Sequence, residues 1–247
     1  MLMKIALCQM KLSLCDPDAN LSKMLGMLEI PANLYIFPET CLTGFDGTSK
    51  VFNLDLSTYH AELARTGKNV LFGSIVDRKN AAILISKGRI AGYYFKTHLF
   101  SHGGESAFFQ AGDSYVTWEI SGIKVFPQIC YDLRFPVETY LYAAGADLLV
   151  FIANWPVERV EHWDTLLKAR AVENQRFVVG INCVGSHKWR YNGHSAAYDP
   201  WGKRVVFLGE EEDVKVVEID TSHIKEVSDA FNTRKDFRPE LIGGVSS

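Results

Sequence analysis

The sequence predicts an α/β fold in which two sheets are covered by helices on their outer faces. Short apolar runs typical of buried strands alternate along the chain with amphipathic helical segments. Several neighbouring runs are joined by two-residue turns that contain glycine, which indicates antiparallel hairpins rather than a purely parallel sheet. No linker rich in proline, glycine or serine divides the 247 residues. We therefore expect a single domain over residues 1–247, with a C-terminal arm from about residue 228.

The first elements are a strand, a helix and a second strand. Residues 4–10 form an apolar run typical of a buried strand. Asp16 and Pro17 then supply a helix N-cap and a proline at the first helical position. Residues 34–37 form a short apolar strand, which Pro38 ends.

Two hairpins are expected in the middle of the chain, because Lys87-Gly88 and Ser121-Gly122 separate runs rich in β-branched and aromatic residues. The elements of this part are a helix around 59–65, a strand at 69–76, and hairpin strands at 81–86, 89–95, 115–120 and 123–130.

The second half continues the same alternation. The expected elements are a helix at 136–145, a strand at 147–153, a long helix at 158–176, and strands at 177–182, 194–199, 203–208 and 213–219. Residues 231–247 are polar and rich in glycine, which indicates an arm or a partly mobile tail.

Composition excludes several classes of function. The net charge is −3 and the basic residues are scattered among acidic ones, so nucleic acid is not an expected partner. No apolar stretch approaches the roughly 18 residues that span a bilayer, and no secretory signal is present. The five cysteines form no CxxC pair, which indicates neither a disulfide framework nor a zinc site. We expect a cytoplasmic protein without a metal.

Cys130 is a candidate nucleophile. It follows the apolar run 123–129 and precedes the polar stretch 131–134. A cysteine at a strand-to-helix junction can expose its sulfur near backbone N–H groups, which favour a thiolate and can accept a developing oxyanion. A core cysteine at a strand end is the alternative, and position alone favours neither.

A cysteine nucleophile needs a base, for which the sequence offers two kinds of residue. Glu39 lies at the end of the strand 34–37, where apolar neighbours would raise its proton affinity; a loop carboxylate facing water is the alternative. His98 would instead provide a Cys-His pair, which is the rival mechanism.

Two further charged residues could complete a site. Lys96 follows three aromatic residues at a strand end, where its ammonium could stabilise an oxyanion if it turned inward, or protect the strand edge if it faced water. Glu105 lies in a glycine-containing segment and could equally be an exposed loop carboxylate.

Together these residues resemble the three signatures of the nitrilase superfamily of carbon–nitrogen hydrolases, in the family's order and at similar separations. The resemblance runs from the first strand to about residue 220, and further agreement comes from Glu105, from 110–112 and from 170–174. The signatures are Pro38-Glu39, Lys96-Thr97-His98-Leu99-Phe100 and Cys130-Tyr131-Asp132-Leu133-Arg134-Phe135-Pro136.

The resemblance implies a four-layer α-β-β-α sandwich that assembles as a homodimer, with no metal or organic cofactor. It implies that Cys130 is the nucleophile, Glu39 the general base and acid, and Lys96 the cation that stabilises the oxyanion. Glu105 would be a second glutamate that positions Lys96 or the substrate.

The motif at Cys130 and the segment 153–156 are most similar to the omega-amidase branch, which implies a small amide substrate that also carries a carboxylate. Candidate substrate-binding residues are Tyr131, through its backbone N–H, Arg134, Trp155 and Phe45. Arg134 could instead form a structural ion pair, and the two aromatic residues could be core. A carbamoyl-amide hydrolase, a nitrilase and a non-catalytic dimeric binding module are the alternatives.

Overall fold

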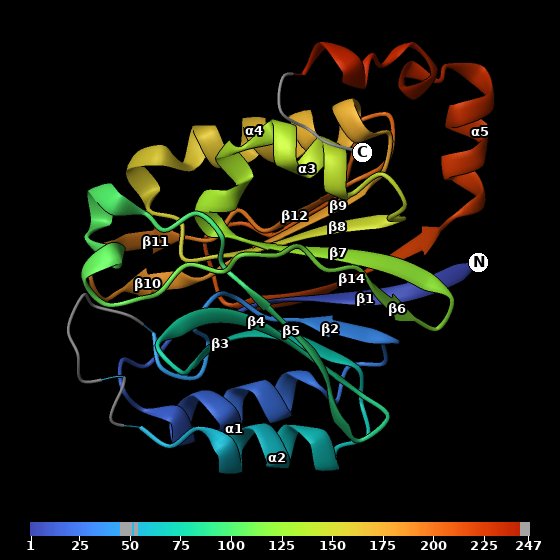
Figure 1. Ribbon diagram of the computed structural model, residues 1–247. Helices are drawn as coiled ribbons and strands as arrows, with labels where there is room; N and C mark the ends of the chain where they lie inside the picture. Colours follow the sequence, from blue (N-terminus) through green and yellow to red (C-terminus); the bar gives the residue numbers. More distant parts are fainter. Residues whose placement is uncertain (45–50, 52–53, 243–247) are drawn as a thin grey trace.

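The computed structural model describes residues 1–44, 51 and 54–242. Figure 1 shows four layers: α1 and α2, a first sheet, a second sheet, and α3 and α4. In the described residues the strand order is β14-β1-β2-β3-β4-β5 in the first sheet and β13-β12-β9-β8-β7-β6 in the second. The expected four-layer sandwich is therefore what the chain forms.

The first half of the chain builds most of the first sheet and its helical layer. Its elements are β1 (Leu2–Gln9), α1 (Pro17–Met27), β2 (Leu34–Ile36), α2 (Ser57–Arg65), β3 (Val70–Val76), β4 (Lys79–Ser86) and β5 (Arg89–Phe95). Asp16 caps α1 as expected, since its side chain accepts a hydrogen bond from the backbone N–H of Ala19 at 3.1 Å.

The second half builds the second sheet and returns to the first at its end. Its elements are β6 (Trp118–Ile120), β7 (Ile123–Ile129), α3 (Pro136–Tyr142), β8 (Leu148–Ala153), α4 (Val160–Asn174), β9 (Phe177–Asn182), β10 (Val184–Ser186), β11 (Arg190–Asn192), β12 (Ala196–Tyr198), β13 (Arg204–Phe207), β14 (Asp213–Asp220) and α5 (Ser222–Ala230).

Both expected hairpins are present, with β4 antiparallel to β5 and β6 antiparallel to β7. Two expected boundaries of the β6–β7 hairpin are wrong. The strand expected at 115–120 begins only at Trp118, and the strand expected to reach Cys130 ends at Ile129. The second difference has a local cause, because Cys130 adopts a positive φ of 49° that no strand accommodates.

The long helix is shorter than its pattern indicated. A 3-10 turn occupies Val157–Arg159 before α4 begins, and Gln175 ends α4 in the left-handed conformation. The hairpin of β10 and β11 and the helix α5 were not expected from the sequence. The arm is also more regular than expected, since 3-10 turns form at Thr233–Asp236 and Pro239–Leu241.

Three apolar cores separate the four layers. One lies between the two sheets and contains alternate residues of β1, β7, β8 and β9. The other two lie beneath the outer helices, one under α1 and α2 and one under α3 and α4. Because both sheets are buried on two faces, the central strands read as continuous apolar runs. Within the described residues, no helix has both the length and the apolar character required to cross a membrane.

Candidate active site

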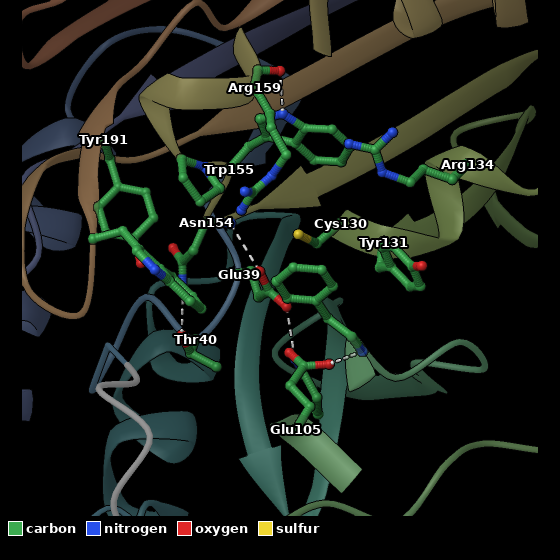
Figure 2. A pocket seen from close by; sticks show the side chains of 14 residues that line it. Glu39, Thr40, Glu105, Cys130, Tyr131, Arg134, Asn154, Trp155, Arg159 and Tyr191 are labelled. Atoms are coloured by element: carbon green, nitrogen blue, oxygen red, sulfur yellow. Dashed lines mark hydrogen bonds between the residues drawn. The ribbon is translucent and has the colours of Figure 1, made fainter. Parts of the chain in front are cut away.

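A pocket opens where β2, β5, β7 and β8 end. These strands point in one direction within their sheets, so the residues that follow them meet at a common edge. Figure 2 shows the Cys130 sulfur and the Glu39 carboxylate facing this pocket from opposite sheets. The lining residues are Glu39, Thr40, Asn80, Phe100, Glu105, Cys130, Tyr131, Arg134, Asn154, Trp155, Pro156, Arg159, Trp189 and Tyr191.

The turn that carries Glu39 lies directly against β3. The backbone N–H of Gly73 donates to the carbonyl of Pro38 at 3.0 Å, and that of Cys41 donates to the carbonyl of Gly73 at 3.0 Å. A Cβ atom at position 73 would lie 2.4 Å from the Glu39 Cα. Glycine at this position therefore permits the close approach that fixes the Glu39 backbone.

The Glu39 side chain is buried, with 3% of the residue exposed, and its carboxylate is fully engaged. Oε1 accepts hydrogen bonds from Asn80 Nδ2 at 2.7 Å and from Lys96 Nζ at 3.0 Å. Oε2 accepts from the backbone N–H of Asn154 at 2.8 Å. The solvated loop carboxylate considered from the sequence is therefore wrong for Glu39, and its orientation is set by groups from both sheets.

Lys96 lies between two carboxylates. Its ammonium is 3.0 Å from Glu39 Oε1 and 2.8 Å from Glu105 Oε1, and its side chain is fully buried. Burial alone would lower the pKa of Lys96, but the charges of Glu105 and Glu39 outweigh this and hold its pKa well above the usual value. Lys96 is a buried cation behind two carboxylates that line the pocket, and not an exposed residue that protects a strand edge.

Glu105 is placed by a short turn rather than by a regular element. It begins the 3-10 turn Glu105–Ala107, and its Oε2 accepts a hydrogen bond from the backbone N–H of Phe100 at 2.7 Å. Its Oε1 accepts a hydrogen bond from the Lys96 ammonium. The Glu105 carboxylate therefore connects Lys96 to the backbone of Phe100. The exposed-loop alternative is wrong for Glu105 as well.

Cys130 follows β7 and begins a 3-10 turn that runs to Arg134. Burial raises the pKa of its thiol, the Glu39 carboxylate raises it further, and Lys96 only partly opposes them. The sequence led us to expect a turn that favours the thiolate. The raised pKa indicates instead a neutral thiol beside the Glu39 carboxylate in the free protein.

The candidate substrate-binding residues Tyr131, Arg134 and Trp155 all line the pocket, whereas Phe45 lies outside the described residues. The Arg134 guanidinium is 4.7 Å from the centre of the Trp155 ring. His98 does not line the pocket, since its Nδ1 lies 2.9 Å from Asp132 Oδ1 and its Nε2 faces Glu138 at 3.7 Å. That placement does not support the Cys-His pair.

Several pocket residues were not singled out from the sequence. Asn80 lies just before the expected strand 81–86, so its side chain had no predicted direction. Asn154 belonged to a quoted motif, but its bond to Glu39 joins residues that are 115 positions apart. Arg159 carried a usable signal, because it is a cation four residues after Trp155 at a helix start.

The comparison with known proteins identifies the family. A family model described as carbon-nitrogen hydrolase matches residues 4–229. The chain belongs to this family. It is a carbon–nitrogen hydrolase, and the family resemblance drawn from the three signatures is confirmed.

Relatives of this hydrolase match over nearly their whole length. A 2-oxoglutaramate amidase of Bacillus subtilis is 33% identical, over 96% of this chain and 98% of that protein. The omega-amidase YafV of Escherichia coli K12 is 30% identical, over 95% and 96%. A CN-hydrolase superfamily protein of Xanthomonas campestris, solved with an arsenic adduct in its active site, has a TM-score of 0.88 at 30% identity, over 96% and 98%.

Proposed function

We propose that this hydrolase is a thiol-dependent amidase of the omega-amidase type. It would cleave the side-chain amide of a small carboxylate-bearing substrate, such as 2-oxoglutaramate or succinamate, to acid and ammonia. The observation that carries the proposal is that Lys96 lies between Glu39 and Glu105, the two carboxylates that line the pocket with Cys130. Relatives described as omega-amidases support the substrate class.

The first half of the reaction forms a thioester. Glu39 takes the proton from the Cys130 thiol as the sulfur attacks the amide carbon. The oxyanion that forms is stabilised by the Lys96 ammonium and by the backbone N–H of Tyr131. Protonated Glu39 then gives its proton to the leaving nitrogen, the carbon–nitrogen bond breaks, and ammonia departs.

The second half uses the same groups in reverse. Glu39 takes a proton from water, the hydroxide attacks the thioester carbonyl, and Lys96 again stabilises the oxyanion. The carbon–sulfur bond breaks, the acid leaves, and Cys130 regains the proton. Because the raised pKa of Cys130 keeps its thiol protonated beside Glu39, each cycle can begin with the proton in place.

Two arginines support recognition of a carboxylate. Arg134 and Arg159 both line the pocket, and neither guanidinium forms an ion pair with a carboxylate among the residues that the structure describes. Burial lowers the pKa of Arg134, and the charge of Arg159 lowers it further. Two cations that lie together without a counter-ion favour an anionic ligand.

The test measures ammonia release from succinamate and from butyramide, which has a similar length but no carboxylate. We expect succinamate to be the better substrate by at least about tenfold in kcat/KM, because a charge-assisted contact contributes roughly 1.5–3 kcal/mol. Arg159→Met should remove most of this preference. Equal rates on both amides would contradict the proposed substrate class.

Intact mass spectrometry tests the nucleophile. Cys130→Ala should abolish both ammonia release and the acyl adduct that a slow amide leaves on the protein, whereas Cys8→Ala, a change at a buried cysteine of β1, should preserve both. Comparable turnover by Cys130→Ala would overturn the mechanism. Release of carbon dioxide with ammonia would indicate a carbamoyl-amide hydrolase, and turnover of a nitrile would indicate a nitrilase.

We also propose that the hydrolase is a cytoplasmic homodimer. Val137 and Tyr142 on α3 and Val172 on α4 are at least half exposed although they are large and apolar, which supports association through this outer layer. The free thiols of Cys8, Cys41, Cys130 and Cys183 support a reducing compartment. Light scattering should give twice the mass of one chain, and Val172→Glu should give a single chain; a wild-type monomer would contradict the assembly.

A further inference from the structure

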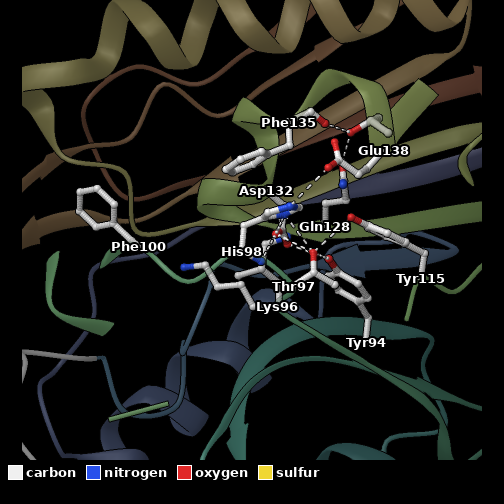
Figure 3. A network of polar contacts seen from close by, with 12 residues as sticks. Tyr94, Lys96, Thr97, His98, Phe100, Tyr115, Gln128, Asp132, Phe135 and Glu138 are labelled. Carbon is white, nitrogen blue, oxygen red and sulfur yellow. Dashed lines mark hydrogen bonds and ion pairs between the residues drawn. The ribbon is translucent and has the colours of Figure 1, made fainter. Parts of the chain in front are cut away.

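A buried carboxylate beside the site takes no part in the proposed chemistry. Asp132 is two residues after Cys130, is fully buried and does not line the pocket. Figure 3 shows it at the centre of a network that also contains Tyr94, Thr97 and His98. Because burying a carboxylate is costly unless donors satisfy it, its neighbours indicate what it does.

One group of donors comes from the segment that flanks Lys96. Tyr94 donates from its hydroxyl to Asp132 Oδ2 at 2.8 Å. Thr97 donates from its hydroxyl to Oδ1 at 3.1 Å, and the backbone N–H of His98 donates to the same oxygen at 2.9 Å. The residues on both sides of Lys96 are therefore attached to one carboxylate.

The other donor comes from the segment that carries the nucleophile. The backbone N–H of Ile129 donates to Asp132 Oδ2 at 3.1 Å across the turn. Cys130 lies inside this turn with a φ of 49°, a conformation that is unfavourable for a non-glycine residue and persists only where its surroundings hold it. The His98 ring adds a second contact, since it stacks on Phe135 with 3.7 Å between the ring centres.

We propose that Asp132 is a positioning residue that holds the Cys130 turn and the Lys96 strand end in fixed relation, and so sets the distance between sulfur and ammonium. Tyr94 belongs to the first sheet and Ile129 to the second, so this link joins the two halves of the site. The inference rests on the proposed roles of Cys130 and Lys96.

Two reactions of the same sulfur distinguish positioning from simple stability. Hydrolysis of succinamate needs Lys96 at the oxyanion, whereas alkylation of Cys130 by iodoacetamide displaces iodide and forms no oxyanion. A variant that shifts the sulfur relative to the ammonium should therefore lose kcat, while iodoacetamide still modifies the same cysteines as in the wild type. A variant that merely unfolds part of the protein should instead expose the buried Cys8, Cys41 and Cys183 to iodoacetamide.

The variants are Asp132→Asn and the milder Tyr94→Phe, with Tyr35→Phe as the matched control. Tyr35 is also a buried tyrosine of the first sheet, and its hydroxyl donates to the carbonyl of Ile30 at 2.6 Å, away from the site. We expect Tyr94→Phe to lower kcat per alkylatable site about 10-fold and Asp132→Asn about 100-fold, with KM little changed. Tyr35→Phe should leave kcat within about twofold.

The outcomes separate the inference from the proposed function. Wild-type kcat per alkylatable site in Tyr94→Phe would overturn the positioning role, whether or not Asp132→Asn folds. A loss of kcat accompanied by alkylation of Cys8, Cys41 or Cys183 would overturn it as well, because unfolding would then explain the loss. If instead Cys130→Ala hydrolysed succinamate normally, the proposed function itself would fail, independently of any Asp132 variant.

Discussion

At the scale of a single residue, Lys96 compensates the negative charge of the two glutamates that line the pocket. Its ammonium neutralises part of the charge of Glu39 and Glu105, so two carboxylates can remain close together inside the protein. Removal of one partner from a buried ion pair leaves an uncompensated charge, which is more costly than the net contribution of the pair. We therefore expect Lys96 to stabilise the folded site as well as the oxyanion.

Lys96→Met is expected to lower kcat by about 100- to 1,000-fold, because it removes a donor that stabilises the oxyanion. It should also lower the free energy of unfolding, by about 3 kcal/mol, since Glu39 and Glu105 would then face each other without a cation. Steady-state kinetics and urea denaturation measure the two effects. Lys124→Met, on an exposed position of β7, is the control, and kcat within tenfold of the wild type would contradict the role of Lys96.

The sequence located the charged residues of the site better than their partners. Glu39, Lys96 and Cys130 each follow an apolar strand, so the pattern predicted where they would lie. The bond from Asn80 to Glu39 depends on how β3 and β4 pair, which no local pattern specifies. The raised pKa of Cys130 could likewise not be predicted from the sequence, because it results from burial and from the nearby Glu39 carboxylate.

At the scale of elements, β3 and α2 support the site from beneath. Gly73 lets the Glu39 turn lie on β3, and His60 of α2 contacts the same strand through Ser74 Oγ at 2.9 Å. Because both contacts are buried and closely packed, we expect substitutions at Gly73 and His60 to change activity or stability more than substitutions at exposed positions.

Gly73→Ala should reduce activity strongly, because its Cβ would lie 2.4 Å from backbone atoms of Glu39 and Thr40 that cannot move aside without displacing the carboxylate. We expect kcat to fall about 100-fold. Gly26→Ala is the matched control: it lies in α1 with nothing within 4 Å of the new Cβ, and should be neutral or slightly stabilising. Equal activities of the two variants would show that the Glu39 turn tolerates displacement.

His60 predicts a pH dependence of stability. Burial lowers the pKa of His60 to about 4, from 6.5, and the nearby Asp55 only partly opposes this. The unfolded chain therefore binds the proton more readily than the folded protein, and the free energy of unfolding falls as the pH drops from 6.5 to about 4. The loss should total roughly 3 kcal/mol.

Urea denaturation at several pH values measures this loss. His60→Gln should flatten the curve between pH 6.5 and about 4, the interval set by the lowered pKa of His60. His102→Gln, at an exposed histidine, should keep the wild-type curve. If His60→Gln also retained the wild-type slope, other groups would have to cause the acid sensitivity.

Three elements were not predicted from the sequence, namely β10, β11 and α5, and each lacks a clear hydrophobic pattern for a physical reason. β10 and β11 are three residues each and form a separate two-stranded sheet, so they show little alternation. The helix α5 begins directly after β14 and buries only Ile224 and Val227 on one face. The long apolar strands were predicted because burial on both faces leaves a continuous apolar run.

At the scale of the whole molecule, the C-terminal arm lies across the outer helical layer. Gln175 at the end of α4 accepts hydrogen bonds from the backbone N–H and the hydroxyl of Thr233. Arg234 donates to the carbonyl of Tyr140 and to Asn174 Oδ1, both at 3.0 Å, and its guanidinium lies over the Tyr140 ring. The arm thereby joins α3 to α4.

Arg234→Ala should release the arm without altering the pocket. The lost hydrogen bonds and ring contact predict a fall of about 2 kcal/mol in the free energy of unfolding and faster proteolysis after residue 230. Limited trypsin digestion followed by mass spectrometry measures the second effect. Arg238→Ala, at an exposed residue paired only with Glu240, is the control, and equal digestion of both variants would contradict the anchoring role.

The pairing of β1 with β14 determines when the protein can finish folding during synthesis. Leu2 lies opposite Asp220, so β1 cannot complete its pairing until β14, at the other end of the domain, has been synthesised. Until then β1 offers an unpaired edge to any extended segment nearby, whether from the same nascent polypeptide or from another. Chaperone demand during translation should therefore depend on how quickly residues 213–220 emerge.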